Sequence, residues 1–378
     1  MRVLIIDKTA GLETSQERFR QLAKYPDLEL HVLAPCKWHE HGLVVDAAKL
    51  HPPDGYQLHL GHCIWKGYYA RGMYLSGLWR AFWRSRPDIV HLLEEPWSFF
   101  AAQAVRAARL WSWKSRFIFY TWENIYRDGK YNSRISLIQN RIDRRVMRRS
   151  AAAMCATEAA RSVLEIKGFE GRIEVIPYGV DTPFLAGNIE PALPQKPQVF
   201  RIGYVGRFLK MKGLDNLIEA ASKIKDSQLL LIGQGDYEGA MRTLIERKGI
   251  TNRTMILSPV AREKLPSYLT TLDVLVLPSR TTPGWMEQLG RVLLEAMAVG
   301  VPVIGSDSGA IPEVIGDAGI IYPEDEPHTL ARSLENLRND PSLRQEMIRR
   351  GKQRIASRYN WARFADETYR LYQEVLKV

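Results

Sequence analysis

The second half of the chain contains the sequence DVLVLPSRTTPGWMEQLGRVLLEAMAVGVPVI at residues 273–304. Its first run, VLVL, is short and apolar and ends at Pro278, which predicts a buried strand. Apolar residues then recur at helical spacing up to Ala298, and Gly300 ends the pattern. A second apolar run, VPVI, follows. Strand, helix and strand in this order predict a parallel βαβ unit.

The same alternation extends along most of the chain. In the first half we expect strands at 2–7, 29–34, 88–93, 117–121, 152–156 and 173–177. In the second half we expect them at 200–205, 228–232, 255–258, 274–277, 301–304 and 320–322. Residues 181–199 between the two series hold four prolines and no clear period, which predicts an extended linker. The pattern therefore predicts an α/β protein with two Rossmann-like domains, residues 1–180 and 200–359.

The final segment has the composition of a packed helix. Five apolar residues recur in it at near-helical spacing: Trp361, Phe364, Tyr369, Leu371 and Leu376. We therefore expect a terminal helix over residues 360–378 that is buried along one face.

Composition excludes several classes of protein. The chain has 378 residues, of which 46% are apolar and 25% charged, so it is globular rather than disordered or fibrous. No apolar run approaches the ~20 residues that a membrane-spanning helix needs. The start MRVLIID reads as a strand rather than a signal peptide, so we do not expect export. Three cysteines without CxxC spacing fit a reducing cytoplasm.

Positive charge is concentrated in the first half. The net charge is +11, and residues 1–180 hold 27 basic against 18 acidic residues. Residues 65–86 combine five basic residues with many aromatic ones and no acid, and residues 141–149 hold five arginines; we expect both stretches to be helical. One interpretation is a solvated cationic face with the aromatic side chains packed inward. The other is docking on an anionic membrane surface. No nucleic-acid-binding motif accompanies the charge, so nucleic acid is not an expected partner.

Loops that follow parallel strands are where ligands bind in open α/β sheets. The sequence YVGRFLKMKG at residues 204–213 follows one such strand. Gly206 permits a tight turn, and Arg207 and Lys212 bring two cations to the strand end, where they can hold a diphosphate. The alternative is a solvated basic loop.

A second candidate loop precedes the helix of the opening βαβ unit. Pro283 and Gly284 break the chain after the strand, and we expect the helix to begin near Glu287. The amides of Leu289 and Gly290 would then form a phosphate seat at the helix N-terminus.

Two carboxylates flank that phosphate seat. Glu287 lies at its mouth, whereas Glu295 is about two turns and ~12 Å further on, so the two cannot touch the same atoms. Carboxylates at both ends suit a ligand with hydroxyl groups at both ends, such as a nucleotide sugar. Taken singly, Glu287 also reads as an acid that favours the helix dipole, and Glu295 as an ordinary surface acid.

Together Glu287 and Glu295 form the E-x7-E motif of retaining GT-B glycosyltransferases, and the chain resembles family 4 of these enzymes, the glycosyl transferases group 1. The resemblance covers MRVLIID, DIVHLL, VIPYGVD, GYVGRFLKMKGLDNLIEA, LLLIGQGD and the stretch from DVLVLPS to GIIYPED. It implies two Rossmann-like domains with parallel sheets facing a central cleft. It also implies that the last helix crosses back, so that residues 360–378 join residues 1–180.

The resemblance further implies a set of residues that bind a nucleotide-diphosphate sugar. The set is Arg207 and Lys212 at the diphosphate, Glu295 at the ribose hydroxyls, Glu287 at the transferred sugar, the Leu289 and Gly290 amides beside the phosphate, Val260 near the base, and Gly11 in the first-domain loop that faces donor and acceptor.

Two features depart from the family pattern. Members commonly have a Gly-Gly pair in the first loop, where this chain has Gly11 alone. Many members carry a histidine near the transferred sugar, after the strand matched by FIFYT, where this chain has Glu123 as our candidate. The alternative for Glu123 is a turn acid paired with Arg127. His91 lies within the strand-like IVHLL, and we interpret it as a core residue.

The implied activity is that of a retaining hexosyltransferase in polysaccharide, glycolipid or cell-envelope glycan synthesis. The basic, aromatic stretch 65–86 suggests a glycan or a lipid-linked acceptor, and we expect a cytoplasmic protein that binds peripherally to the inner membrane face. The chain has no DxD triplet or HExxH motif, so neither a metal nor another cofactor is expected. A nucleotide-sugar epimerase of related fold and a noncatalytic sugar-nucleotide-binding protein are the alternatives.

Overall fold

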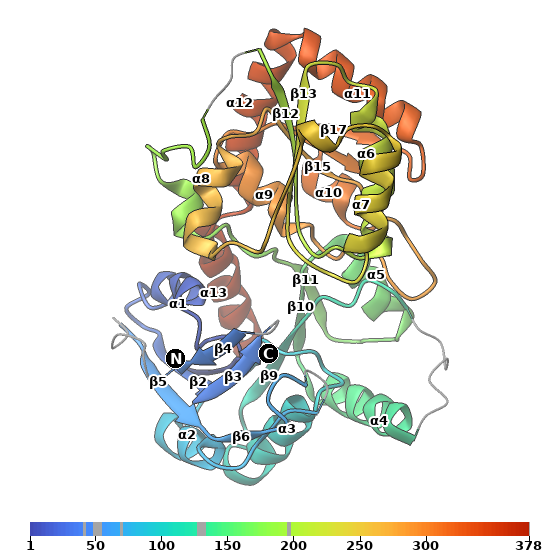
Figure 1. Cartoon of the computed structure of the whole chain (residues 1–378). Helices are drawn as coiled ribbons and strands as arrows, with labels where there is room; N and C mark the ends of the chain where they lie inside the picture. Colours follow the sequence, from blue (N-terminus) through green and yellow to red (C-terminus); the bar gives the residue numbers. More distant parts are fainter. Residues whose placement is uncertain (41–42, 48–54, 69–70, 127–133, 195–197, 378) are drawn as a thin grey trace. The chain divides into compact units, whose positions relative to one another are not determined.

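The computed structural model describes residues 1–378 except 41–42, 48–54, 69–70, 127–133, 195–197 and 378. The chain divides into two compact units (Figure 1). The first comprises Met1–Gly179 and Trp361–Val378, and the second comprises Val180–Asn360. The last helix thus belongs to the first unit, as the family resemblance implies.

The first unit is built on a parallel sheet with the strand order β11-β10-β9-β8-β1-β2-β5 in the described part of the chain. The strands are β1 (Arg2–Ile6), β2 (Glu29–Pro35), β5 (Gln57–Gly61), β8 (Ile89–Leu92), β9 (Arg116–Thr121), β10 (Ala152–Cys155) and β11 (Arg172–Val175). All of these except the edge strand β5 were expected from the sequence. β1 and β8 are neighbours although far apart in the chain, so the loops after them meet where the strand order reverses.

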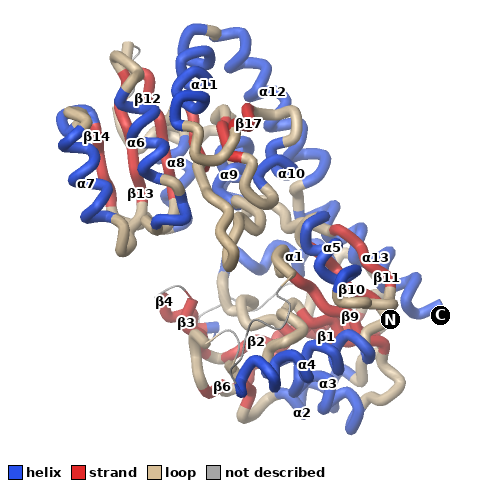
Figure 2. The backbone as a smooth tube through the Cα atoms, turned by 90° about the vertical axis from the view of Figure 1, so that its right-hand side faces the viewer, coloured by secondary structure: helices blue, strands red, loops and turns tan. Residues whose placement is uncertain are grey.

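Alternating side chains of this sheet enter two separate cores. Leu4 and Ile6 of β1 pack on one side, against α2 (Leu78–Ser85), α3 (Phe99–Trp111), α4 (Arg134–Arg149) and α5 (Glu158–Ile166). Val3 and Ile5 pack on the other side, against α1 (Gln16–Leu22) and α13 (Trp361–Lys377). Figure 2 shows α2, α3 and α4 beside one another along one side of the strands. Strands buried on both faces explain the nearly continuous apolar runs in the sequence.

The expectation of a helix throughout residues 65–86 is wrong. Among the described residues of this range only Leu78–Ser85 is helical, and the segment before it contains the short strand β7 (Met73–Tyr74), which pairs with β6 (Cys63–Ile64). Gly77, directly before α2, has φ +88°, which is not a helical conformation, so a helix cannot continue through this residue. The second antiparallel pair, β3 (Lys37–Glu40) with β4 (Leu43–Asp46), was also not predicted. Residues 141–149 are helical, as expected, within α4.

The buried face of α13 differs in part from the expected one. Trp361, Phe364 and Leu371 are buried as predicted, but Tyr369 is only partly buried and Leu376 is 40% exposed. Tyr372 and Val375 occupy the core instead.

His91 connects α13 to the centre of the first sheet. Its imidazole is completely buried, as expected for a core residue, and Nδ1 lies 2.6 Å from the hydroxyl of Tyr372. Burial lowers the pKa of His91 to about 3, so the ring is neutral at physiological pH. The pair therefore places a polar contact inside the largely apolar interface between the sheet and α13.

The second unit has a parallel sheet with the order β14-β13-β12-β15-β16-β17 in the described residues. Its strands are β12 (Phe200–Val205), β13 (Ser227–Ile232), β14 (Thr254–Leu257), β15 (Val274–Leu277), β16 (Val303–Ser306) and β17 (Ile320–Tyr322). Its helices are α6 (Leu214–Ser222), α7 (Glu238–Arg247), α8 (Leu265–Leu269), α9 (Arg291–Ala298), α10 (Ile311–Ile315), α11 (Pro327–Asn339) and α12 (Pro341–Arg358). The strand order reverses between β12 and β15, so the loops after these two strands form the expected ligand position.

The stretch expected as an extended linker packs on the second unit. Phe184, in the short turn Thr182–Leu185, is fully buried. The backbone amide of Ala192 donates to the carbonyl of Ser267 at 2.8 Å.

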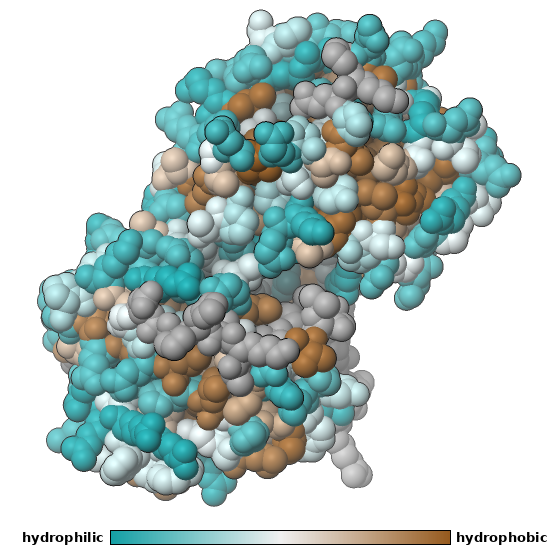
Figure 3. Space-filling model, turned by 60° about the vertical axis from the view of Figure 1, so that its left-hand side comes forward, coloured by the Kyte–Doolittle hydropathy of each residue, from teal (hydrophilic) through white to brown (hydrophobic). Residues whose placement is uncertain are grey.

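Figure 3 shows hydrophobic residues among hydrophilic ones on the surfaces that it draws. Among the helices described here, none is both long enough and apolar enough to cross a bilayer.

We expect Tyr372→Phe to destabilise the protein, because it leaves a buried imidazole nitrogen without its partner. The expected cost is about 1–3 kcal/mol in the free energy of unfolding, measured by urea denaturation. Tyr369→Phe is the matched control, since that hydroxyl donates to Asp27 at the surface at 2.6 Å. Equal losses in the two variants would contradict a special role for the buried pair.

The neutral state of His91 also predicts a pH dependence of stability. The unfolded imidazole binds a proton below pH 6.5 but the folded one only near pH 3, so stability falls as the pH drops through this window. Between pH 7 and pH 5 the wild type should lose about 2 kcal/mol more than His91→Gln does. Identical changes in the unfolding free energy of both proteins would contradict this prediction. They would show that His91 takes up a proton between pH 7 and pH 5 as readily in the folded state as in the unfolded state.

Candidate functional site

Three loops meet by direct backbone contact at the carboxyl edge of the second sheet. Gly213 has φ +64°, and a Cβ atom there would lie 1.9 Å from the carbonyl oxygen of Pro278. A Cβ atom on Gly233 would lie 1.9 Å from the carbonyl oxygen of Gly206. Only glycine fits at these two positions. The loop after β12 is therefore held between the loop after β13 and the loop after β15.

The two predicted residues Lys212 and Glu287 are brought together by this arrangement. Nζ of Lys212 lies 2.6 Å from Oε2 of Glu287, although the residues are 75 positions apart. The same oxygen accepts a hydrogen bond of 2.7 Å from the buried hydroxyl of Ser279. Nζ of Lys212 also lies 4.6 Å from the centre of the Trp285 ring. A cation and a carboxylate thus sit side by side at the position where the strand order reverses.

Arg207 lies in the same loop but in a different environment. Its side chain is exposed, and among the described residues it has no ion pair or hydrogen-bond partner. Its carbonyl oxygen accepts a hydrogen bond of 2.9 Å from the hydroxyl of Tyr204, which orients the turn. An exposed guanidinium and a partly buried lysine in one loop are groups that can bind an anion.

The helix α9, which follows the loop after β15, begins later than expected. It starts at Arg291 rather than near Glu287, and Gly290 precedes it with φ +64°. A Cβ atom on Gly290 would lie 2.9 Å from Cδ2 of Leu277. The Leu289 and Gly290 amides therefore lie immediately before the helix and not in its first turn.

Glu287 lies in the preceding loop and not in the helix. Its carbonyl oxygen accepts the amide of Ala310 at 3.0 Å, which ties the loop to the start of α10. The alternative interpretation of Glu287 as a helix N-terminal acid is wrong for this reason.

Glu295 is buried within α9, which contradicts the alternative of an ordinary surface acid. Its Oε1 lies 2.7 Å from the guanidinium of Arg262, which also donates at 2.7 Å to the buried carboxylate of Asp181. Arg291 contacts the same Asp181 oxygen at 3.2 Å. Val260, the residue predicted near a nucleotide base, is partly buried in the loop between β14 and Arg262.

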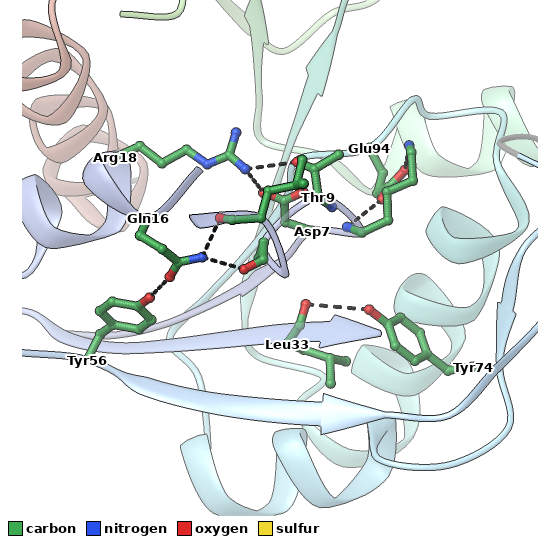
Figure 4. Close-up of polar contacts among 11 residues, drawn as sticks. Asp7, Thr9, Gln16, Arg18, Leu33, Tyr56, Tyr74 and Glu94 are labelled. Carbon is green, nitrogen blue, oxygen red and sulfur yellow. Dashed lines mark hydrogen bonds and ion pairs between the residues drawn. The ribbon is translucent and has the colours of Figure 1, made fainter. Parts of the chain in front are cut away.

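The first unit has its own polar cluster where the strand order reverses (Figure 4). Asp7 follows β1 and accepts hydrogen bonds from the amide and the hydroxyl of Thr9 at 2.7 and 2.8 Å. The buried guanidinium of Arg18 pairs with the same carboxylate and donates to the Thr9 hydroxyl at 2.9 Å. The Lys8 amide donates to Glu94 after β8 at 3.0 Å, and their side chains form an ion pair.

The loop that contains Gly11 is also held from the opposite side. The side-chain amide of Gln16 donates to the carbonyl oxygens of Ala10 and Leu12 at 2.5 and 2.9 Å. The hydroxyl of Tyr56 in turn donates to Gln16. Gly11 is buried in the turn between these contacts, so the loop has a defined conformation with a single glycine.

Glu123 follows β9 and takes part in an ion-pair network. Its carboxylate pairs with Lys167, whose Nζ also lies 2.8 Å from Asp143. The partner suggested by the sequence, Arg127, lies outside the described residues. A role for Glu123 at a transferred sugar stays a prediction.

Several residues at these edges escaped the sequence analysis. They are Ser279, Arg262, Asp181 and Glu95. Burial and the nearby carboxylate of Glu123 raise the pKa of Glu95 to about 7. Each lies near the end of a predicted strand or, for Asp181, at the start of the expected linker, and this position is the signal that could have identified it. Within the described ranges, no group of three or more His, Cys, Asp or Glu side chains is arranged to hold a metal ion.

Two family models match the chain, and together they span most of it. The model described as glycosyl transferases group 1 matches residues 188–354. The model described as a glycosyl transferase 4-like domain matches residues 20–179. These ranges correspond to the second and the first structural units.

The chain is also similar to characterised proteins. It is 28% identical over 250 residues to alpha-D-kanosaminyltransferase of Streptomyces kanamyceticus, which covers 62% of this chain and 63% of that protein. It is 30% identical over 212 residues to a GDP-mannose-dependent monoacylated alpha-(1-6)-phosphatidylinositol monomannoside mannosyltransferase of Corynebacterium glutamicum, which covers 51% and 54%. The chain thus spans between half and two thirds of the length of these curated relatives.

Solved structures support the fold. HepE of Anabaena, solved in complex with UDP, superimposes with a TM-score of 0.71 over 99% of this chain and 100% of HepE, at 16% identity. At that identity the likeness concerns the fold alone. The family matches, the two parallel-sheet units and the returning last helix agree, and the chain belongs to the glycosyl transferases group 1, with the GT-B fold.

Proposed function

We propose that this chain transfers a hexose from a nucleotide-diphosphate donor to an acceptor hydroxyl, with retention of the anomeric configuration. Relatives named for GDP-mannose-dependent mannosyl transfer and for kanosaminyl transfer, and a structural neighbour solved with UDP, support a nucleotide-sugar donor. The synthesis of polysaccharide, glycolipid or cell-envelope glycan is the pathway class that we propose for it.

The observation that carries the proposal is the pairing of Lys212 with Glu287 at 2.6 Å, in a loop that also holds the exposed Arg207. Both cations belong to one loop at the strand-order reversal of the second sheet, where α/β folds bind phosphorylated ligands. Glu287 accepts hydrogen bonds and suits sugar hydroxyls, while the two cations suit a diphosphate. The site thus offers complementary groups for the two halves of a nucleotide sugar.

The proposed chemistry depends on charge stabilisation. As the bond from the anomeric carbon to the diphosphate breaks, the nucleoside diphosphate leaves with the bonding electrons. Arg207, Lys212 and the amides of Leu289 and Gly290 would stabilise this growing negative charge, which is usually the largest catalytic effect. The acceptor oxygen then bonds to the anomeric carbon from the same face, and its proton passes to an oxygen of the departing diphosphate. The proposed reaction uses the protein's own cations and no metal ion.

Glu295 is the proposed ligand of the ribose hydroxyls. Its carboxylate is held in a fixed position by Arg262, which Asp181 fixes from the other side. A preorganised acceptor of this kind loses little entropy when a hydroxyl pair binds. Arg262 is therefore a positioning residue for Glu295.

We propose a glycan or a lipid-linked acceptor on the cytoplasmic side, at the inner membrane face. An epimerase would consume the same donor without any acceptor, and a noncatalytic binding protein would leave the donor intact. Product analysis with and without acceptor separates these alternatives.

The donor site is tested by thermal shift with UDP-, GDP-, ADP- and dTDP-sugars. At 100 times its dissociation constant the correct donor should stabilise the wild type by ~2.7 kcal/mol. Glu295→Gln should lose most of this shift, because the amide cannot accept two hydroxyl hydrogen bonds as a carboxylate does. The exposed Glu246→Gln is the matched control. A full shift in Glu295→Gln would remove Glu295 from the donor site.

The role of Lys212 is tested with Lys212→Met. We expect kcat for sugar transfer to fall by about 10²–10³-fold, because the variant loses one charge that stabilises the leaving diphosphate. Lys210→Met changes an exposed lysine of the same turn and should keep near-normal activity. The measurement is release of nucleoside diphosphate with and without acceptor. Equal rates in the two variants would overturn the assignment.

A further inference from the structure

The helices on one side of the first sheet carry large apolar side chains on their outer surface. Five that lie on α2, at the end of α3 and in the turn after it are between 52% and 70% exposed: Trp79, Trp83, Leu110, Trp111 and Trp113. We call this set the aromatic face. The interpretation of residues 65–86 as a cationic face with its aromatic side chains packed inward is therefore wrong for Trp79 and Trp83.

Contacts between helices join these residues into one surface. Trp79 and Trp83 lie one turn apart on α2 and thus share a side of that helix. Phe82 lies between them in sequence, and its ring centre is 6.5 Å from that of Trp111 on α3. The guanidinium of Arg149, at the end of α4, donates to the Trp113 carbonyl at 3.0 Å. Tertiary packing thus adds residues 110–114 and the end of α4 to the basic, aromatic stretch seen in the sequence.

The surroundings of the aromatic face are strongly cationic. Helices α2, α3 and α4 together contain ten arginines and one acidic residue, Asp143. That acid is buried and paired with Lys167 at 2.8 Å, so it does not offset the surface charge. Arg80 lies 6.0 Å from the ring centre of Trp79, and Lys114 lies 5.2 Å from that of Trp113.

We propose that the aromatic face docks the protein on the surface of an anionic lipid bilayer. Indole rings partition to the headgroup region of membranes, where their apolar body is shielded from water and their N–H can form hydrogen bonds. Basic side chains beside them are attracted by the negative surface potential. Indole partitioning and electrostatic attraction on one face together support reversible peripheral binding to the membrane.

The same charge would attract nucleic acid, but the apolar residues favour the membrane. Leu110 and Trp111 stand exposed side by side at the end of α3, and an aliphatic side chain gains little from a phosphate backbone. Headgroup and acyl regions accommodate both residues. Nucleic-acid binding is therefore an outcome that the test must separate.

Docking extends the proposed function, because it names the surface at which the chain would meet a lipid-linked acceptor. The role of docking in reaching that acceptor rests on the proposed function, whereas membrane binding itself does not. The aromatic face belongs to the first unit, whereas Lys212, Glu287 and Glu295 belong to the second. Vesicle binding needs no donor and no transfer. Failure of docking and failure of the transferase assignment are therefore read out separately.

The test is sedimentation of the full chain with vesicles of phosphatidylcholine alone or mixed with phosphatidylglycerol. We expect binding to the anionic vesicles only, and a decrease as salt rises. Trp79→Ser, Trp83→Ser and Trp113→Ser combined should weaken it at least about tenfold, since three interfacial indoles are lost. Because these side chains are exposed, the melting temperature should stay near that of the wild type.

A charge-matched pair of variants separates a specific surface from net charge. Arg80→Glu, Arg84→Glu and Lys114→Glu combined should abolish binding to anionic vesicles. Lys225→Glu, Arg247→Glu and Arg332→Glu make the same change in charge at exposed positions of the second unit and should bind as the wild type does.

Three results would overturn docking. They are equal losses in the two charge-reversed variants, binding that survives the loss of the tryptophans, and no quenching of tryptophan fluorescence by brominated phosphatidylglycerol. Competition by double-stranded DNA that is insensitive to the three tryptophan substitutions would assign the face to nucleic acid instead.

Discussion

Backbone contact between loops, made possible by glycine, is the constraint on which the candidate donor site depends. At Gly213 and Gly233 a Cβ atom would lie 1.9 Å from a carbonyl oxygen of a neighbouring loop. The absence of side chains at these points lets the loop after β12 approach the loop after β15. Without that approach Lys212 and Glu287, 75 positions apart, would not meet. Local backbone geometry thus controls the chemistry of the second unit.

Both carboxylates of the E-x7-E motif are neutralised by cations from other loops. Glu287 pairs with Lys212, and Glu295 pairs with Arg262. A buried carboxylate without such a partner carries a large desolvation cost, so each cation makes the burial of its acid possible. The pairs also fix the orientation of the carboxylates. The site that we propose for a nucleotide sugar is therefore arranged before any ligand arrives.

The first unit also has a polar cluster in the loops where the strand order reverses, but its residues differ from those of the second unit. Asp7, Thr9 and Arg18 stabilise the loop after β1, and Glu94 connects it to the neighbouring loop after β8. On one face of the sheet, α2, the end of α3 and the turn after it expose indoles, and α2, α3 and α4 carry arginines around them. Polar loops at the strand ends and an aromatic, cationic helical layer are two separate surfaces of one unit.

Much of the fold was predictable from the sequence, because the spacing of apolar residues along the chain reflects local secondary structure. Every strand expected at the centre of the two sheets is present, and so are α4 and the terminal helix. The errors concern features that local period does not encode. The edge strand β5 and the short antiparallel pairs depend on pairing with distant residues. Gly77, with φ +88°, ended a pattern that otherwise reads as helical.

The candidate site divides in the same way. The sequence alone determined which residues stand at strand ends and that Glu287 and Glu295 share the spacing of a known family. Tertiary structure decided that α9 begins at Arg291, that Arg262 reaches Glu295, and that residues 110–114 join the aromatic face. Spacing along a chain specifies local conformation, whereas these contacts join separate loops and helices. Such contacts form only when packing of the apolar cores sets the distance between elements.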